Sequence, residues 1–317
     1  MQEALSEQVA ASWLAAMRRG DWAEAWRQTD RLELPRRLAQ RRAGFQRQPH
    51  HLVWDGTSFE GRSVLVRCEH GLGDTLQFIR FVPRITAVAR ELNLMVQPQL
   101  LQLLAGAPGL GEVRNAWTNE PAPAHEVEIE IMELAYALRC DLQHLPPPYP
   151  HLRERAAGGF PLELPREGPL RAGLLWAASD WDPTRSIPLR TLEPLLRSRQ
   201  VRFYSLQQGP AAVDPLFGQL PIVPLSHLTR EVRAAAAAML QLDLVITVDG
   251  MPAHLAATLG RTTWLLLKHE ADWRWMEGRD DTPWYPGMRL FRQPQRGDWD
   301  GAVMAAAGAL SAFGSPA

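Results

Sequence analysis

The sequence is poor in several features that mark whole classes of protein. Its only cysteines, Cys68 and Cys140, stand far apart among 317 residues and offer neither a disulfide framework nor a zinc site. No run of eighteen apolar residues occurs, so no membrane span is expected. The first twenty residues lack the long apolar core of a signal peptide, which indicates a cytoplasmic protein. A net charge of -1 argues against a nucleic-acid partner.

What is present suits a globular protein of two domains. The length fits two α/β domains of roughly 100–150 residues each, and 46% hydrophobic residues is an ordinary share for such a protein. Twelve tryptophans is a high number, and five of them come after residue 260. Packing is the simpler interpretation of these rings, although aromatic side chains near a binding site would also stack on sugar faces.

The first fifty residues predict a pair of helices. Apolar residues recur at helical spacing at Ala10, Trp13, Leu14 and Met17. Gly20 then breaks the chain, and Asp21 is a candidate N-cap with Glu24 three residues on. The pair resembles one tetratricopeptide unit, but no second copy follows at a 34-residue period. We expect residues 1–50 to dock on the domain that follows, and a protein partner for these helices is a further expectation.

Residues 51–160 predict a first Rossmann-like domain. A β-rich run at 63–68 ends in the glycine turn 71–73, and a helix begins at Asp74. Further strands are predicted at 92–96 and 127–131, with a short helix at 100–104. The proline-rich segment 146–150 cannot be helix or inner strand, so the domain boundary is expected between it and Pro169.

Residues 161–317 predict a second domain of the same kind. Strands are expected at 172–176, 201–206, 244–248 and 262–267. Helices are expected between them at 188–196, 232–240 and 252–259. This alternation predicts an α/β fold with parallel sheets, and such sheets bind ligands outside the carboxyl ends of their strands.

The turn after the first strand carries the first candidate site. Gly71 and Gly73 would let a ligand approach the backbone, and the helix start offers free N–H groups. Asp74 could act as a general base towards a hydroxyl, with an N-cap role as the alternative. The run is not G-x-G-x-x-G, which counts against a nicotinamide-dependent oxidoreductase.

The run E-H-G-L-G-D-T-L-Q-F-I-R-F-V-P, residues 69–83, resembles the opening motif of glycosyltransferase family 9, which contains the ADP-heptose:lipopolysaccharide heptosyltransferases. The closer resemblance is to bacterial relatives that follow tetratricopeptide repeats. Four more blocks keep the family's order: 185–189, 205–210, 243–254, and 272–275 with 283–286. Together they cover about residues 54 to 300, nearly the whole chain.

The resemblance implies a metal-independent glycosyltransferase with a GT-B fold, in which two Rossmann-like domains face a cleft. The implied donor is a nucleoside-diphosphate sugar, with an ADP-sugar favoured and heptose as the candidate sugar. No cofactor is implied. The acceptor would be a bacterial glycan, lipopolysaccharide among them, or a protein. Without a metal, the donor diphosphate must be held by basic side chains and helix N-termini.

The resemblance also implies the donor-binding residues. In the family a basic residue at the place of Arg185, beside Ser186, contacts the donor phosphates. The turn with Asp249, Gly250 and His254 cradles the phosphates. Gln207 and Gln208 match the segment that lines the nucleotide pocket. The alternatives are a surface ion pair for Arg185, a helix histidine bonded to backbone for His254, and solvated glutamines.

Two departures from the family pattern leave other functions open. Met251 and Pro252 stand where the family usually has small residues, and Pro252 removes one N–H from the phosphate turn. A catalytically inactive scaffold or binding protein with the same fold is therefore the alternative function. Asp180 and Asp182, in the loop after Trp176, would suit a glycosidase, which nothing else in the sequence supports.

Overall fold

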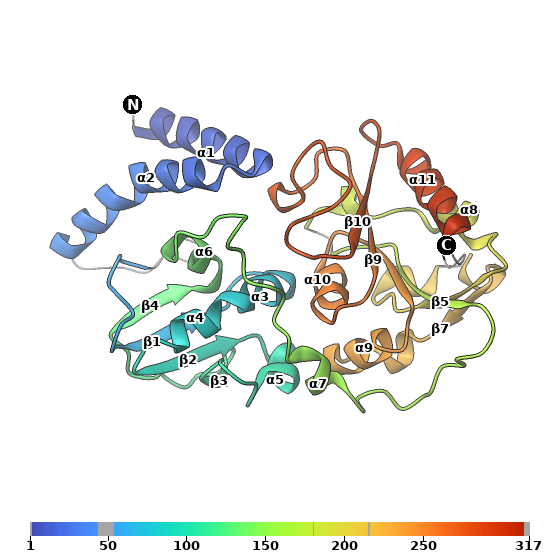
Figure 1. Cartoon of the computed structure of the whole chain (residues 1–317), viewed down its shortest axis with the longest axis horizontal. Helices are drawn as coiled ribbons and strands as arrows, with labels where there is room; N and C mark the ends of the chain where they lie inside the picture. Colours follow the sequence, from blue (N-terminus) through green and yellow to red (C-terminus); the bar gives the residue numbers. More distant parts are fainter. Residues whose placement is uncertain (1, 44–53, 180, 215, 314–317) are drawn as a thin grey trace. The chain divides into compact units, whose positions relative to one another are not determined.

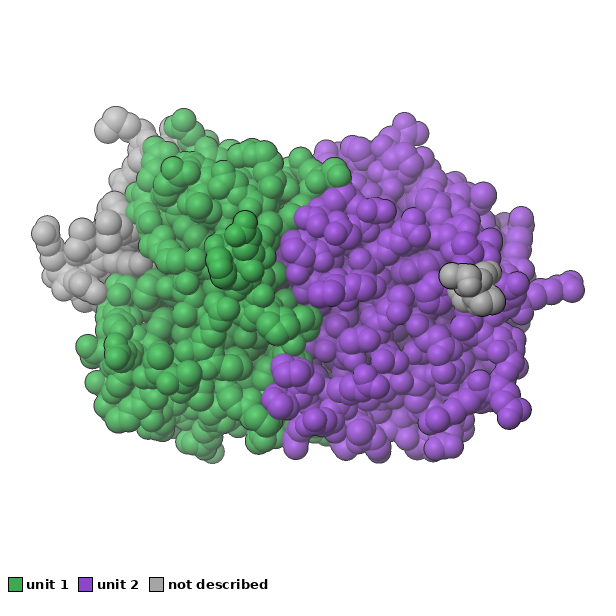
Figure 2. Space-filling model, in the orientation of Figure 1, with its two compact units in different colours: residues 1–149, 272–278 green, residues 150–271, 279–317 purple. Residues whose placement is uncertain are grey.

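The computed structural model describes residues 2–43, 54–179, 181–214 and 216–313, with side chains described for residues 7–32 and from residue 54 on. Within these residues the chain forms two compact units. Unit 1 comprises residues 1–149 and 272–278, and unit 2 comprises residues 150–271 and 279–317 (Figure 2). None of the helices in the described ranges combines the length and apolarity that a bilayer span requires.

Unit 1 is built on a parallel sheet of four strands with the order β3-β2-β1-β4 (Figure 1). The strands are β1 Ser63–Arg67, β2 Glu91–Val96, β3 Glu112–Asn115 and β4 Val127–Glu130. The connecting helices are α3 Leu72–Phe78, α4 Val82–Thr86, α5 Leu101–Leu104 and α6 Leu134–Ala137. The β-branched and apolar residues of β1 are buried on both faces, as a central parallel strand requires.

The helices α1 Gln2–Arg19 and α2 Trp22–Ala43 pack against this unit, as the sequence predicts. Gly20 adopts φ +78° between them, and the N–H of Asp21 reaches the carbonyl of Ala16, which closes α1 with a Schellman motif. Asp21 Oδ1 accepts a bond from the N–H of Glu24 at 3.1 Å, which confirms the predicted cap of α2.

The docking contacts of α2 lie around α6. Trp26 Nε1 donates to the carbonyl of Cys140 at 2.7 Å, and its ring lies 5.7 Å from that of Tyr136. Asp30 accepts bonds from the Tyr136 hydroxyl and from Arg139. The helical extension is therefore part of the core of unit 1 and buries its own apolar face there.

Unit 2 is built on a parallel sheet of six strands with the order β10-β9-β8-β5-β6-β7. The strands are β5 Leu170–Leu175, β6 Val201–Ser205, β7 Ile222–Pro224, β8 Leu244–Val248, β9 Thr263–Leu267 and β10 Met288–Arg292. The helices are α7 Leu152–Ala156, α8 Glu193–Leu196, α9 Val232–Met239, α10 Met251–Thr258 and α11 Trp299–Ala312. Two parallel sheets with connecting helices confirm the predicted α/β class.

Burial within the two units explains most of the late tryptophans. Trp264 and Trp299 pack with β8 and α11 in one apolar cluster, and Trp275 and Trp284 are fully buried elsewhere. Packing is therefore the main role of these rings. Gly173 is required in the middle of β5, because a Cβ there would lie 2.6 Å from Leu242 Cδ1 and 2.8 Å from Leu206 Cδ1.

The structure differs from the predicted elements at a few places. The segment predicted as a helix at 188–196 is a 3-10 turn, Leu189–Leu192, followed by the short α8. Strands β3, β7 and β10 and helix α11 were not predicted. The first two are short, and β3 is almost entirely polar, so neither gives a hydrophobic run that could be detected.

Candidate functional site

Each sheet reverses its strand order at one point, where ligands of parallel α/β sheets usually bind. In unit 1 the chain runs outward from β1 to β2 and β3 and then returns to β4 on the other side of β1. The reversal therefore lies between the carboxyl ends of β1 and β4. The Gly71 turn follows the first of these ends and Glu130 closes the second.

Asp74 lies at this point in the third position of α3. Its Oδ2 accepts a bond from the N–H of Gly71 at 2.9 Å, so the side chain caps its own helix. Its Oδ1 accepts a bond from Arg274 Nη2 at 2.6 Å, and the side chain keeps 24% exposure. The carboxylate is therefore a cap and an ion-pair partner that solvent can still reach, and its role as a base stays a prediction. Gly73 lies in the first turn of the same helix.

Glu130 is a second carboxyl group at this reversal, and no motif in the sequence singles it out. It is 3% exposed, its Oε2 accepts from the N–H of Met132 at 2.7 Å, and His70 Nε2 lies 3.8 Å from the same oxygen. Burial raises the pKa of Glu130 to about 8, against the effect of the Met132 bond, and the charges of Glu133 and Asp74 add to the rise. The site therefore contains a buried carboxyl group, Glu130, whose neutral form is favoured.

The thiol of Cys68, next to these carboxyls at the end of β1, offers no nucleophile. Cys68 is buried, and its burial, with the nearby charge of Glu130, raises the pKa of the thiol well above its usual range. The chemistry available at this end of unit 1 is that of its carboxyls and of His70.

In unit 2 the strand order reverses between β5 and β8. The loop after β5 leads to a 3-10 turn, Pro183–Arg185, and the turn after β8 leads to α10. Arg185 joins the two, because its Nη1 donates to the carbonyl of Asp249 at 3.1 Å. The structure thus brings together two of the predicted donor-binding residues at the expected place in the sheet.

Arg185 is only 7% exposed, yet the described residues do not satisfy every N–H of its guanidinium group. Nη2 donates to Ser179 Oγ at 3.2 Å, Nε donates to the carbonyl of Asp182 at 3.4 Å, and the group lies 4.4 Å from the ring centre of Trp181. These three bonds leave two of the five guanidinium N–H groups without a hydrogen-bond partner among the described residues. Two N–H donors in one guanidinium plane suit a bidentate anion.

The turn after β8 has room for a ligand. Gly250 is extended, and a Cβ added to it would have no contact closer than Pro252 Cδ at 3.7 Å. Pro252 lies in the first turn of α10, where proline is normal, and the N–H of Ala253 is bonded to the carbonyl of Gly250. His254 is buried, and its Nδ1 lies 2.9 Å from the hydroxyl of Tyr285. One partner of the His254 ring is thus a side chain.

The remaining predicted residues shape the same loops. Gln207 Oε1 accepts from the N–H groups of Trp176 and Ala177 at 2.9 Å each, and Nε2 donates to two carbonyls, so this amide braces the loop after β5. Ser186 Oγ accepts from the N–H of Ala178. Gln208 is exposed and donates to the carbonyl of Ser226 at 3.0 Å. A nucleotide contact by either glutamine stays a prediction.

Lys268, at the end of β9, adds a second cation. Its Nζ lies 2.7 Å from Asp182 Oδ2. Burial opposes ionisation of Asp182, but the bonds from Lys268 and Thr184 outweigh it and lower the pKa of Asp182 below its usual range. The carboxylate is therefore committed to this ion pair and to capping the turn before Arg185. The other half of the proposed glycosidase pair, Asp180, lies outside the described residues.

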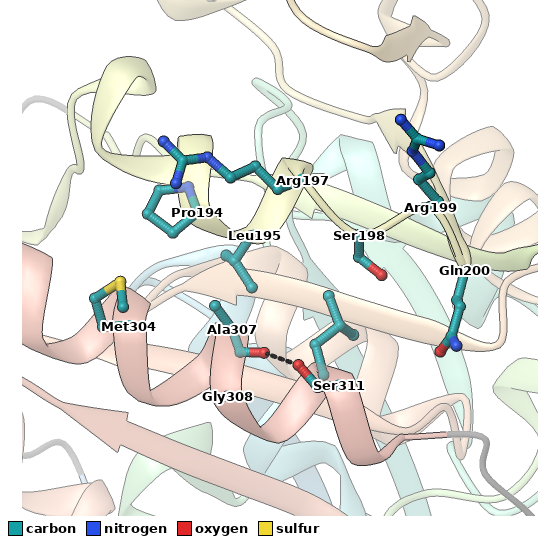
Figure 3. A pocket seen from close by; sticks show the side chains of 11 residues that line it. Pro194, Leu195, Arg197, Ser198, Arg199, Gln200, Met304, Ala307, Gly308 and Ser311 are labelled. Carbon is teal, nitrogen blue, oxygen red and sulfur yellow. Dashed lines mark hydrogen bonds between the residues drawn. The ribbon is translucent and has the colours of Figure 1, made fainter.

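A surface hollow of about 620 Å³ lies elsewhere on unit 2, between α8 and α11. Figure 3 shows Arg197 and Arg199 on one wall and Met304 and Ser311 on the other. Gln200, at its edge, precedes the first residue of β6, so the hollow lies at the amino end of that strand. None of the candidate residues lines it. Among the described residues, no group of three or more His, Cys, Asp or Glu side chains could hold a metal ion.

The chain is similar to known proteins in sequence and in fold. No family model matches the chain. Protein FlbA of Caulobacter vibrioides is 25% identical over 291 residues, which cover 82% of this chain and 48% of FlbA. The chain thus spans about half the length of this curated relative.

Solved structures are similar over both sheets. A family 9 glycosyltransferase of Veillonella parvula superposes with a TM-score of 0.58 at 12% identity, over 81% of this chain and 97% of that one. The chain has the fold of the family 9 glycosyltransferases. E. coli ADP-heptose LPS heptosyltransferase II superposes with a TM-score of 0.55 at 14% identity, over 79% of this chain and 98% of that chain. E. coli heptosyltransferase WaaC with ADP-2-deoxy-2-fluoro heptose superposes with a TM-score of 0.51 at 13% identity, over 79% of this chain and 98% of that chain. The resemblance read from the motifs is therefore confirmed at the level of the fold.

Proposed function

We propose that the protein is a glycosyltransferase that moves a sugar from a nucleoside diphosphate to an acceptor hydroxyl, without a metal ion. The observation that carries the proposal is the buried side chain of Arg185 at the strand-order reversal of unit 2, which has two guanidinium N–H groups without a hydrogen-bond partner in the part of the chain that the structure describes. Lys268 and the start of α10 add positive charge nearby. Such a site suits a diphosphate, and ADP is the favoured nucleotide because two of the similar structures are named for ADP-heptose or its analogue.

Asp74 supplies the base in this proposal. The acceptor oxygen forms the new bond to the anomeric carbon of the sugar, and the bond from that carbon to the diphosphate breaks. Asp74 takes the hydroxyl proton, while Arg185 and the turn at Asp249 hold the charge that develops on the leaving diphosphate. The sugar is proposed to be heptose, and the acceptor a bacterial glycan or a protein side chain. The helices α1 and α2 offer a surface for a protein partner.

Nucleotide binding tests the proposal directly. Isothermal calorimetry without metal would compare ADP, GDP, UDP, CDP and dTDP, each beside one sugar conjugate, on the wild type and on Arg185→Ala. Loss of charged hydrogen bonds should weaken binding of the preferred nucleotide about 10- to 100-fold. Arg199→Ala removes an arginine from the hollow at the amino end of β6 and should bind like the wild type.

Two further results complete this test. Arg185→Lys keeps one charge and should lie between the wild type and the alanine variant, since an ammonium cannot make a bidentate contact. Failure of all five nucleotides to bind below millimolar concentrations would contradict the proposal. It would favour the inactive scaffold, with Met251 and Pro252 as the cause.

A further inference from the structure

The segment Asp272–Gly278 is separated from its sequence neighbours and belongs to the fold of unit 1. Helix α1 holds it there. The ring of Trp273 meets that of Trp13 edge-on at 5.5 Å, the N–H of Glu277 donates to the carbonyl of Arg18 at 3.2 Å, and the side chains of Arg18 and Glu277 lie 3.6 Å apart. The segment is thus seated by backbone, aromatic and charged contacts.

The end of the segment is strained. Met276 has φ +49°, a backbone conformation that a residue with a side chain rarely adopts, and it is only 4% exposed. Strained residues of this kind persist only where the surroundings over-determine them. The contacts of α1 on one side and the burial of Met276 on the other supply that constraint. The segment therefore has one well-defined seat.

The seat places Arg274 on the face of α3 that carries Asp74. Arg274 is 9% exposed, and each of its three nitrogens has a partner: Nη2 with Asp74 Oδ1 at 2.6 Å, Nη1 with Asp272 Oδ1 at 2.9 Å, and Nε with Gln77 Oε1 at 2.8 Å. The guanidinium also lies 4.7 Å from the ring centre of Trp273. A planar group held at every nitrogen fixes the direction in which Asp74 points.

Asp74 keeps capacity for a substrate under this restraint. An ionised carboxylate has about four acceptor positions. Arg274 and the N–H of Gly71 take one on each oxygen. A hydroxyl can therefore still donate to Asp74 while both oxygens stay in place. A buried ion pair by itself contributes little net stability, so this arrangement is better explained by orientation than by stability.

We propose that Arg274 is a positioning residue for the base Asp74, and that α1 keeps it in position by seating the segment Asp272–Gly278. The inference deepens the proposed function and rests on it. The amino-terminal helices then act on the chemistry of unit 1 and are more than a surface for other proteins.

The kinetic test uses ADP-heptose as the donor and water as the acceptor, with ADP release as the signal. Arg274→Gln should lower kcat about 100-fold, the order expected when a catalytic group is displaced by an ångström. The KM for ADP-heptose should stay within about twofold, because donor binding is left intact. Arg274→Lys should recover part of the loss, and added guanidinium should partly restore Arg274→Ala.

Two variants serve as comparisons. Trp13→Ala loosens the seat without touching Asp74 and should lower kcat about tenfold, less than the loss of Arg274 itself. Arg279→Gln removes an arginine that pairs with Asp281 just beyond the segment, and it should behave as the wild type. Unchanged kcat in Arg274→Gln, or a rise in KM that accounts for the whole loss, would overturn the inference.

A second measurement separates this inference from the proposed function. Hydrogen exchange of the peptide that contains Gly71 reports on its bond to Asp74 and needs no substrate. Arg274→Gln should speed exchange there about tenfold, and Arg279→Gln should not, because only the first releases the Asp74 carboxylate. If the wild type releases no ADP, the proposed function fails for this donor while exchange still decides the role of Arg274. Equal exchange in the two variants would refute it.

Discussion

The two units place different kinds of ionisable side chain at the same topological position. Where the strand order reverses in unit 1, the side chains are mainly carboxyls, Asp74 and Glu130, and the balancing arginine comes from a distant segment. At the matching place in unit 2 the side chains are cations, Arg185 and Lys268, and the balancing carboxylate is local. The fold fixes where a site can form, and the side chains placed there decide its chemistry.

The largest effect expected from this comparison comes from removing the base. Asp74→Asn should lower kcat for ADP release from ADP-heptose by about 100- to 10,000-fold, the range that general bases contribute. Asparagine still accepts a hydrogen bond but cannot take the proton. Asp21→Asn is the matched control, because Asp21 also begins a helix of unit 1 and only caps it. Activity that survives in Asp74→Asn would remove the chemical contrast between the units.

The next effect concerns the pH dependence of folding stability that Glu130 causes in unit 1. Glu130 binds its proton up to about pH 8 in the folded protein but releases it near 4.5 when unfolded. The folded state therefore holds the extra proton between these values, and stability from this group is lost as pH rises through that window. At about 1.4 kcal/mol per unit, the loss amounts to a few kcal/mol.

Urea unfolding at pH 6 and pH 9 measures this loss. Glu130→Gln is neutral at both values and should show a smaller fall in unfolding free energy than the wild type. Glu128→Gln, whose parent residue pairs with Arg67 on the same sheet, should keep the wild-type fall. Equal falls in all three proteins would mean that Glu130 is already ionised at pH 6.

The smallest effect concerns the turn at Gly250 in unit 2. Gly250→Ala should weaken nucleotide binding about tenfold, because the added methyl group would occupy space that the phosphates need. The melting temperature should hardly change, since the nearest atom to that methyl is 3.7 Å away. Gly308→Ala on α11, where an added Cβ would have no atom within 4 Å, is the control and should leave binding unchanged. Wild-type affinity in Gly250→Ala would place the phosphates away from this turn.

Local pattern was enough to predict much of this structure. The order of strand, glycine turn and helix located Asp74, and the run of buried residues at Leu244–Val248 located the turn at Asp249. Each depends on a few adjacent residues whose spacing sets the backbone. The cap of Asp21 was predictable for the same reason.

Other features depend on contacts that spacing cannot show. Arg274 and Asp74 are 200 residues apart, so nothing local relates them. The raised pKa of Glu130 follows from its burial under surrounding helices and strands, and the residues next to it in the sequence do not reveal that burial. The nucleotide contact expected of Gln207 stays a prediction, and its four bonds to backbone become visible only when the loop after β5 is folded against it.

The return of Asp272–Gly278 to unit 1 also constrains how the protein comes into being on the ribosome. The unit that contains the amino terminus cannot complete its packing until the chain has been made as far as Gly278. By then every strand of unit 2 except β10 has been synthesised. Domains usually fold in the order in which they are made. Here unit 1 is the first to begin synthesis but is among the last to complete its packing. Trp13 can contact the ring of Trp273 only after most of the chain has been synthesised.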